Sequence, residues 1–174
     1  MTTAPRPTFR ELDASEAAEL LARNHVGRIA YSFHNRIDIE PISYVYADGV
    51  IYMRTQPGSK LATLAHAPWV AFEVDEIRGP FDWRSVVARG TVYVLGNTGS
   101  KLAHASYQLA LQHLRALMPH AFDEQDPTPD RTVVLQIHPD VVIGREARAA
   151  GSEQRRPRTF RRGLPDRPCV RPSR

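Results

Sequence analysis

The chain lacks the residues on which several large classes of protein depend. Its 174 residues include a single cysteine, Cys169, which excludes an internal disulfide and any zinc or iron–sulfur site built from several cysteines. No apolar run approaches the roughly 20 residues that a membrane-spanning helix needs. The N-terminal residues contain no apolar stretch typical of a signal peptide. We therefore expect a cytoplasmic protein that does not interact with membranes.

The short motifs of self-contained catalytic and nucleotide-binding sites are also missing. The sequence contains no GxSxG, HExxH, GxGxxG or GxxxxGK[ST] pattern. Its seven histidines are scattered, and we expect surface or packing roles for them. Glu73, Asp75 and Glu76 lack partners at metal-ligand spacing, which favours a solvated strand end and no metal site. No catalytic acid or base can be named, so any redox chemistry would come from a cofactor.

Positive charge is concentrated at the C-terminal end. Residues 147–174 hold nine arginines against two acidic residues, whereas the whole chain carries a net charge of +4. This segment also has four prolines and few large apolar residues, so it cannot bury enough surface to offset its ordering entropy. We expect a folded domain at 1–146 and a disordered Arg/Pro-rich tail at 147–174. The tail either contacts nucleic acid or anionic lipid, or is a solvated extension.

Hydrophobic patterning predicts about six strands and three helices. Helices are expected at 11–24, 60–66 and 100–118, and strands at 26–33, 37–47, 50–55, 69–74, 84–95 and 132–143. Asp13 and Glu16 form a capping-box pair. Pro41 predicts an edge or a bulge, and Gly90 a bulge or a close backbone approach. Antiparallel hairpins dominate, so the predicted fold is mainly β: a small β-barrel with peripheral helices.

The most informative stretch is 51–61, IYMRTQPGSKL. A strand ends in Arg54 and Thr55, a turn follows, and Ser59 and Lys60 open a helix. The first N–H groups of a helix lack internal partners and carry partial positive charge, so they suit an anion such as phosphate. The alternative is an ordinary strand-turn-helix in which Ser59 is the capping residue.

A second Gly-Ser-Lys sequence occurs at 99–101. Lys60 and Lys101 are the only lysines of the chain, and both open a predicted helix. Only the first has cationic and hydroxyl side chains on the preceding strand, so we assign the phosphate there. The second is expected to be simple capping chemistry.

A further group of candidate residues begins the long strand at 84–95. Trp83 could cover a flat ring, and Ser85 shares a strand face with Val87 and Arg89. A hydroxyl or a backbone N–H from this strand could meet the polar edge of a ring. The alternative is an aromatic residue that simply packs against the barrel.

Taken in their order along the chain, these features resemble the pyridoxamine 5′-phosphate oxidase-like flavoproteins, which have the FMN-binding split-barrel fold. Within that family they resemble the branch of nitroimidazole-resistance proteins. The resemblance covers about residues 11–143. It rests on the segments HVGRIAYS, PISYVYADGVIYMRT, PGSKL, VAFEVDE and WRSVVARGTVYVL.

The resemblance implies a homodimer that binds FMN in clefts between its subunits. The implied cofactor-binding residues are Pro41, Ile42 and Ser43 beside the isoalloxazine ring, Arg54, Thr55, Ser59, Lys60 and Leu61 at the phosphate, and Trp83, Ser85 and Val86 at the polar edge of the flavin. The C-terminal substrate-binding segment of pyridoxamine phosphate oxidase itself is not recognisable. The implied function is therefore that of a flavin-dependent oxidoreductase acting on another small molecule.

Two alternatives remain open at the level of the sequence. The same fold hosts deazaflavin-dependent reductases, so the cofactor could be a deazaflavin. The chain could also be a non-catalytic flavin-binding module whose basic tail contacts nucleic acid.

Overall fold

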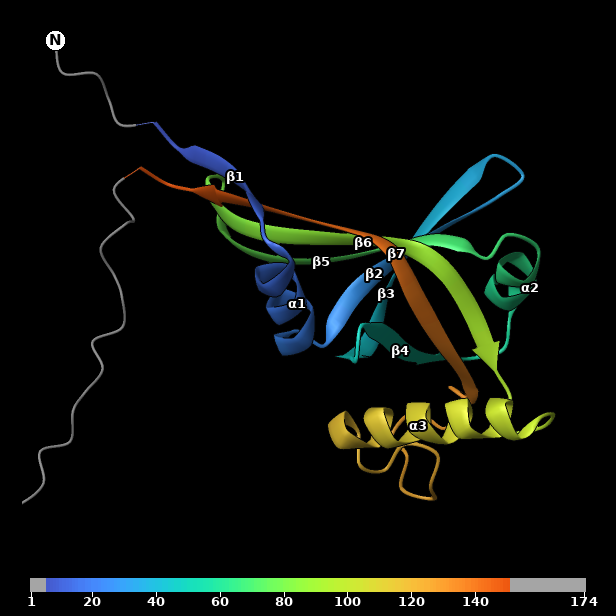
Figure 1. Ribbon diagram of the computed structural model, residues 1–174. Helices are drawn as coiled ribbons and strands as arrows, with labels where there is room; N and C mark the ends of the chain where they lie inside the picture. Colours follow the sequence, from blue (N-terminus) through green and yellow to red (C-terminus); the bar gives the residue numbers. More distant parts are fainter. Residues whose placement is uncertain (1–5, 151–174) are drawn as a thin grey trace, which may run out of the picture.

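Residues 6–150 of the chain are described by a computed structural model, and they form one antiparallel β-sheet with three helices (Figure 1). The elements in chain order are β1 (Thr8–Leu12), α1 (Ala14–Arg23), β2 (Val26–Phe33), β3 (Arg36–Ala47), β4 (Val50–Thr55), α2 (Ser59–His66), β5 (Trp69–Gly79), β6 (Asp82–Leu95), α3 (Lys101–Leu117) and β7 (Val133–Arg148).

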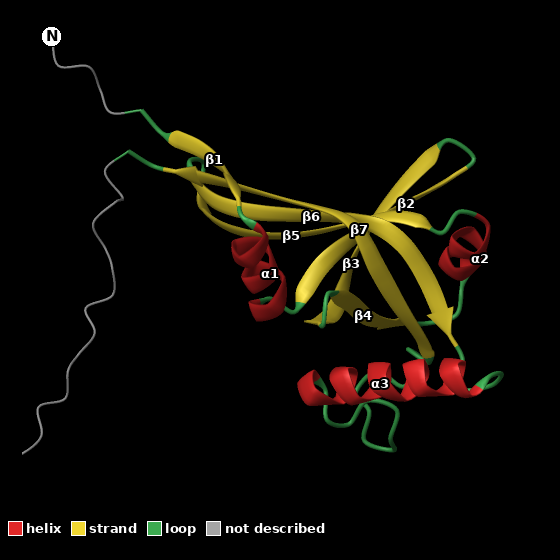
Figure 2. Ribbon diagram, in the orientation of Figure 1, coloured by secondary structure: helices red, strands yellow, loops and turns green. Residues whose placement is uncertain are grey.

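The sheet closes on itself. Its strand order is β1-β7-β4-β3-β2-β5-β6, and β6 also pairs with β7, so six strands form a barrel and β1 is added to the far end of β7. The helices lie at the periphery, with α3 across one end of the barrel and α2 at its side (Figure 2). The mainly β barrel expected from the sequence is therefore confirmed.

Several strands begin and end where the hydrophobic pattern predicts. β2 and β4 have the predicted bounds, and Asp48 and Gly49 form the hairpin turn with φ of 52° and 81°. Pro41 pairs with Arg28 of β2, whereas β4 joins β3 only from Tyr44 onward. Pro41 thus lies on a free edge of β3, where its missing N–H costs no ladder hydrogen bond.

The first strand was not predicted, and the first helix is shorter than expected. Asp13 caps α1 by accepting from the N–H of Glu16 at 2.8 Å, and Glu16 accepts in return from the N–H of Asp13 at 3.1 Å. The capping box is confirmed, but it places Leu12 outside the helix, where it pairs with Gly144 of β7. A strand of five residues that depends on so distant a partner leaves no local pattern to detect.

The last strand is longer than the pattern suggests. β7 continues through Pro139 and runs to Arg148, two residues past the expected domain end at 146. Gly90 of β6 lies at a register shift opposite Pro139, and a Cβ there would be 2.0 Å from the carbonyl oxygen of His138. The bulge and close approach expected at Gly90 are both present. The remaining tail lies outside the described residues.

The barrel interior holds the main core. Tyr44 and Phe72 are fully buried and meet edge to face with their ring centroids 4.8 Å apart. The Tyr44 hydroxyl donates to the carbonyl of Leu21 at 2.7 Å, which ties α1 to the barrel. A smaller cluster around Tyr52 and Leu114 joins α3 to the sheet. Among the described helices, none is long and apolar enough to cross a membrane.

Candidate functional site

Most of the predicted phosphate corner lines one polar hollow of about 240 Å³. It lies where β3, the end of β4 and the start of α2 meet. Its lining residues are Glu40, Pro41, Ile42, Arg54, Thr55, Gln56, Pro57, Gly58, Ser59, Lys60 and Arg131. Six residues predicted from the sequence are thus brought together, namely Pro41, Ile42, Arg54, Thr55, Ser59 and Lys60.

The N-terminus of α2 faces this hollow without a side-chain cap. Gly58 is the N-cap residue and Ser59 is the first residue of the helix, so the capping role considered for Ser59 is wrong. The Leu61 N–H donates to the Gly58 carbonyl at 3.1 Å. Within the described residues, the N–H groups of Ser59 and Lys60 have no acceptor. Two free N–H groups at a helix N-terminus are suited to bind an anion.

Lys60 is held at the hollow by a carboxylate. Its Nζ lies 2.5 Å from Oε2 of Glu40, and the Tyr31 hydroxyl donates to the other oxygen of the same carboxylate. Burial acts to raise the pKa of Glu40, but the bonds from Lys60 and Tyr31 outweigh it, and the pKa is lowered. Glu40 is therefore ionised at neutral pH and takes up part of the charge of Lys60.

Arg54 reaches the hollow from β4, but its two terminal nitrogens bond elsewhere. They form a bidentate ion pair with Asp126, with Nη2 2.6 Å from Oδ1, and Nη2 also donates to Thr128 Oγ1 at 2.5 Å. Arg54 is 2% exposed and its guanidinium lies over the Phe122 ring. The guanidinium lowers the pKa of Asp126 well below its usual range. The terminal nitrogens of Arg54, which the resemblance places at the phosphate, are thus occupied by Asp126 and Thr128.

One donor of Arg54 is still unused. Its Nε is buried and has no hydrogen-bond partner in the described part of the chain. A buried N–H without an acceptor is unfavourable, and a ligand oxygen in the hollow would satisfy it. Together with Lys60 and the free N–H groups of α2, this donor set fits a phosphate group.

The hollow is smaller than a complete cofactor site. Pockets for drug-sized ligands usually measure about 300–1,000 Å³. At about 240 Å³, the hollow accommodates the phosphate end of a nucleotide, and the rest of such a ligand must lie outside it.

The other predicted site residues occupy different positions. Ser43 lies on β3 beside Val26 of β2, and Leu61 packs against the barrel core. On β6, Trp83 lies near Phe9 with ring centroids 6.5 Å apart, and Val86 is fully buried.

Ser85 also lies on β6, away from the hollow, and its hydroxyl donates to Glu73 at 3.0 Å. The acidic residues near it are engaged with basic partners, as Glu73 and Asp75 pair with Arg28 and Glu76 pairs with Arg23. These carboxylates are partly exposed, as expected for a solvated strand end, and the ion pairs with the two arginines add to that expectation.

The sequence-based prediction missed five lining residues: Glu40, the turn residues Gln56, Pro57 and Gly58, and Arg131. Glu40 directly precedes the predicted site residue Pro41, so its position in the sequence could have identified it. Arg131 lies in the segment between α3 and β7, and no local signal connects it with α2.

The second Gly-Ser-Lys sequence has the simple role expected for it. Ser100 is the N-cap of α3 and its hydroxyl accepts from the N–H of Ala103 at 3.2 Å. Lys101 is exposed. The two similar sequences thus differ, because a side chain caps the second helix and none caps the first in the described structure.

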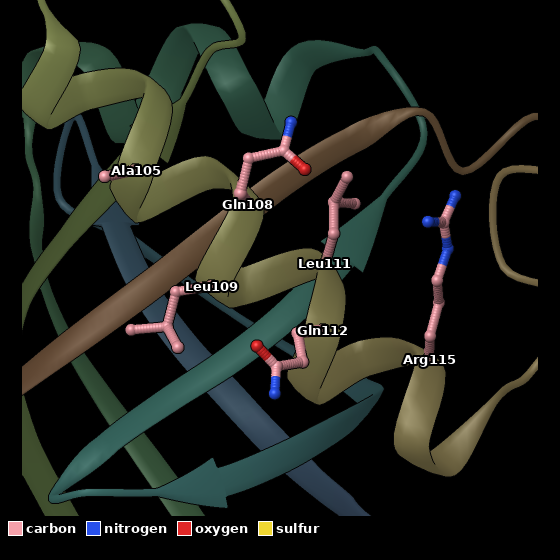
Figure 3. Close-up of a pocket in the computed structure, with 6 residues that line it drawn as sticks. All are labelled: Ala105, Gln108, Leu109, Leu111, Gln112 and Arg115. Atoms are coloured by element: carbon pink, nitrogen blue, oxygen red, sulfur yellow. The ribbon is translucent and has the colours of Figure 1, made fainter.

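A larger hollow, about 680 Å³, lies along α3 (Figure 3). Its lining residues all come from that one helix: Ala105, Gln108, Leu109, Leu111, Gln112 and Arg115. Figure 3 shows these side chains spread along the helix, with no group of charged residues converging on one point. Despite its size, this surface lacks the donor set of the smaller hollow.

Comparison with known proteins identifies the family. The sequence model of pyridoxamine 5′-phosphate oxidase matches residues 13–146, most of the described chain. The chain belongs to the pyridoxamine 5′-phosphate oxidase family. The resemblance inferred from the segments around the phosphate corner is therefore confirmed. No curated protein matches the chain.

Solved structures share the fold. An FAD-binding protein from Mesorhizobium loti is 26% identical, with a TM-score of 0.66 over 81% of this chain and 99% of the other. An FAD-binding protein from Mycobacterium smegmatis is 24% identical, with a TM-score of 0.54 over 79% and 99%. A Bacteroides thetaiotaomicron chain, proposed to be a 5-nitroimidazole antibiotic resistance protein, is 15% identical, with a TM-score of 0.59 over 80% and 88%. Two of these three proteins are FAD-binding by name, and all three share the fold of this chain.

Proposed function

We propose that this chain binds FMN as a homodimer and is a flavin-dependent oxidoreductase acting on a small molecule. The observation that supports the proposal most strongly is the uncapped N-terminus of α2, which shares a polar hollow with Lys60 and the unpartnered Nε of Arg54. The FAD-binding relatives support a flavin nucleotide as the class of cofactor.

Each part of the hollow has a distinct task in this proposal. The N–H groups of Ser59 and Lys60 donate to phosphate oxygens, and the Lys60 ammonium balances the charge. The Thr55 and Ser59 hydroxyls complete the donor set. Pro41 and Ile42, which border the hollow on β3, place the ring against the barrel wall. The bound flavin would supply the hydride chemistry, and the chain would bind and orient it.

The small size of the hollow supports a dimeric site. A flavin ring that extends beyond it needs a second surface to exclude water. The strand segment 138–143 of β7 pairs with β6 alone in the described chain, and Val141, Val142 and Ile143 on it are 37–45% exposed. Exposed apolar side chains on an open strand edge are typical of an interface. In the homodimer, Trp83 and Ser85 would reach the flavin from the second copy.

The experiment is a flavin titration of the full chain and of Lys60→Ala. FMN binding is followed by the quenching of flavin fluorescence, and FAD and a deazaflavin are titrated in parallel. Lys60→Ala removes a charged donor, so we expect FMN binding to weaken by roughly 1.5–3 kcal/mol.

The chain offers a matched control, Lys101→Ala. Lys101 follows the same Gly-Ser pair but opens the capped helix α3, so its loss should leave FMN affinity unchanged. Equal effects of the two substitutions would remove Lys60 from the site. Tighter binding of a deazaflavin than of FMN would reassign the cofactor, and a chain that binds none of the three would refute flavin binding.

A further inference from the structure

Arg131 is a cation of the hollow that comes from a distant part of the chain. It lies just before β7, and its partly buried side chain lines the same hollow as Ser59 and Lys60. Its main-chain N–H donates to the carbonyl of Thr128 at 3.1 Å. Across residues 6–150, no carboxylate forms an ion pair with its guanidinium.

The segment that carries Arg131 is organised around Asp126. The carboxylate of Asp126 accepts from the main-chain N–H groups of Phe122 and Thr128, at 2.8 and 2.9 Å. The same carboxylate holds Arg54 of β4. The buried ion pair thus fastens the segment to the barrel beside the hollow, and the turn to Thr128 brings Arg131 to its edge.

The charges around the hollow distinguish its three cations. Arg54 is neutralised by Asp126, and Lys60 is paired with Glu40. Of these three cations, Arg131 alone has no carboxylate partner among the described residues. A phosphate monoester carries close to two negative charges near neutral pH. It is attracted most strongly to a cation that no carboxylate already neutralises.

We propose that Arg131 binds the phosphate group of the cofactor and, together with Lys60, provides the preference for a phosphorylated flavin. This inference rests on the proposed function, because it concerns the same hollow. A guanidinium offers two parallel N–H donors to two phosphate oxygens, which adds geometric selectivity to charge. The terminal nitrogens of Arg54 already donate to Asp126, so Arg54 serves to position the segment that carries Arg131.

The test compares FMN with riboflavin, which has the same ring but no phosphate. Dissociation constants for both are measured by fluorescence quenching on the full chain, Arg131→Ala and Arg131→Lys. We expect Arg131→Ala to weaken FMN binding about tenfold or more and to leave riboflavin binding unchanged. Arg131→Lys retains the charge, so it should recover part of the loss.

Arg6→Ala is the matched control for net charge. Arg6 is exposed and precedes β1, at the end of the sheet far from α2 (Figure 1). Its substitution should leave both dissociation constants unchanged. The difference in FMN affinity between Arg131→Ala and the parent should also become smaller at high salt, because the missing interaction is between charges. Circular dichroism and the midpoint of thermal unfolding show whether each variant folds as the parent does.

The outcomes separate this inference from the proposed function. If the unmodified chain binds neither FMN nor riboflavin, the flavin site itself is refuted. If it binds FMN and Arg131→Ala binds FMN equally well, the role of Arg131 alone is overturned. Equal losses of FMN and riboflavin affinity in Arg131→Ala would overturn it too, because riboflavin has no phosphate for Arg131 to bind.

Discussion

At the scale of single residues, the site depends on how cations are paired. Arg54, Lys60 and Arg131 line one hollow, yet carboxylates neutralise the first two in the described structure. The Lys60 partner, Glu40, is 42% exposed in its side chain, whereas the Arg54 partner, Asp126, is buried. An exposed carboxylate can turn away when an anion arrives, but a buried one cannot. Lys60 is thus available to a phosphate at a small cost.

The Glu40 carboxylate should oppose the binding of an anion. We expect Glu40→Gln to tighten FMN binding roughly two- to fivefold, because the ion pair that competes for Lys60 is partly exposed and worth at most about 1 kcal/mol. Riboflavin binding should not change. Isothermal titration of both ligands checks this, with Glu19→Gln on the exposed side of α1 as the control. A weaker FMN affinity in Glu40→Gln would mean that Glu40 assists the site.

At the scale of elements, short polar bridges fix the helices to the barrel. Arg23 at the end of α1 donates to both oxygens of Glu76 on β5, at 2.7 and 2.8 Å. Asn24 donates to the same carboxylate at 3.0 Å. These bonds, with the Arg23 contact as the largest cause, lower the pKa of Glu76 to about 2. The bridge therefore stabilises the fold only while Glu76 is ionised.

This bridge predicts a pH dependence of stability. The pKa of Glu76 is lower in the folded than in the unfolded chain, so its contribution is complete above the ordinary value of 4.5 and is lost as the pH falls toward about 2. Because both side chains are partly exposed, we expect Glu76→Gln to reduce the free energy of unfolding by about 1 kcal/mol at neutral pH.

Urea unfolding of the parent and of Glu76→Gln, repeated at decreasing pH, measures this contribution. The difference between the two proteins should narrow below pH 4.5. Glu11→Gln on the exposed side of β1 is the control and should show no such change. A difference that stays constant through this range would show that Glu76 acts by packing and not by charge.

At the scale of the whole molecule, the closed barrel leaves a segment of β7 open along one edge. β4 pairs with β7 over 133–137 and β1 pairs with it over 144–148, so 138–143 lies between them with β6 as its neighbour. The exposed apolar side chains there suit a second copy of the chain. A second copy would also enclose a flavin that the hollow of about 240 Å³ cannot hold alone.

A charge in this open segment should separate the subunits. We expect Val142→Glu to convert a dimer to a monomer, because Val142 is 42% exposed in the single chain and a carboxylate is unfavourable in an apolar interface. FMN affinity should fall when the dimer is lost, while the circular dichroism spectrum is retained. Size-exclusion chromatography with light scattering gives the mass.

Leu102→Glu is the control for this substitution. Leu102 is 77% exposed on α3 and lies outside the open segment of β7, so this variant should remain dimeric. A parent chain that is monomeric and still binds FMN tightly would contradict the dimeric site.

How far the site could be predicted depends on the distance along the chain between its parts. Ser59 and Lys60 follow Thr55 directly, so the turn that joins β4 to α2 brings them together whatever the rest of the chain does. Pro41 and Ile42 were placed beside them by family resemblance. Arg131 could not be placed, because its position depends on the contact between Asp126 and Arg54.

The sequence by itself determined the strand pattern, the hairpins, the capping box of α1 and the strand-turn-helix corner after β4. Each of these depends on residues a few positions apart, where backbone geometry and side-chain periodicity act directly. Only the tertiary structure decided that β1 is a strand and that β6 and β7 close the barrel. It also decided that Asp126 binds the terminal nitrogens of Arg54, while Arg131 has no carboxylate partner among residues 6–150. Those outcomes depend on which distant groups are neighbours, and burial and charge pairing among such groups leave no mark on the local sequence.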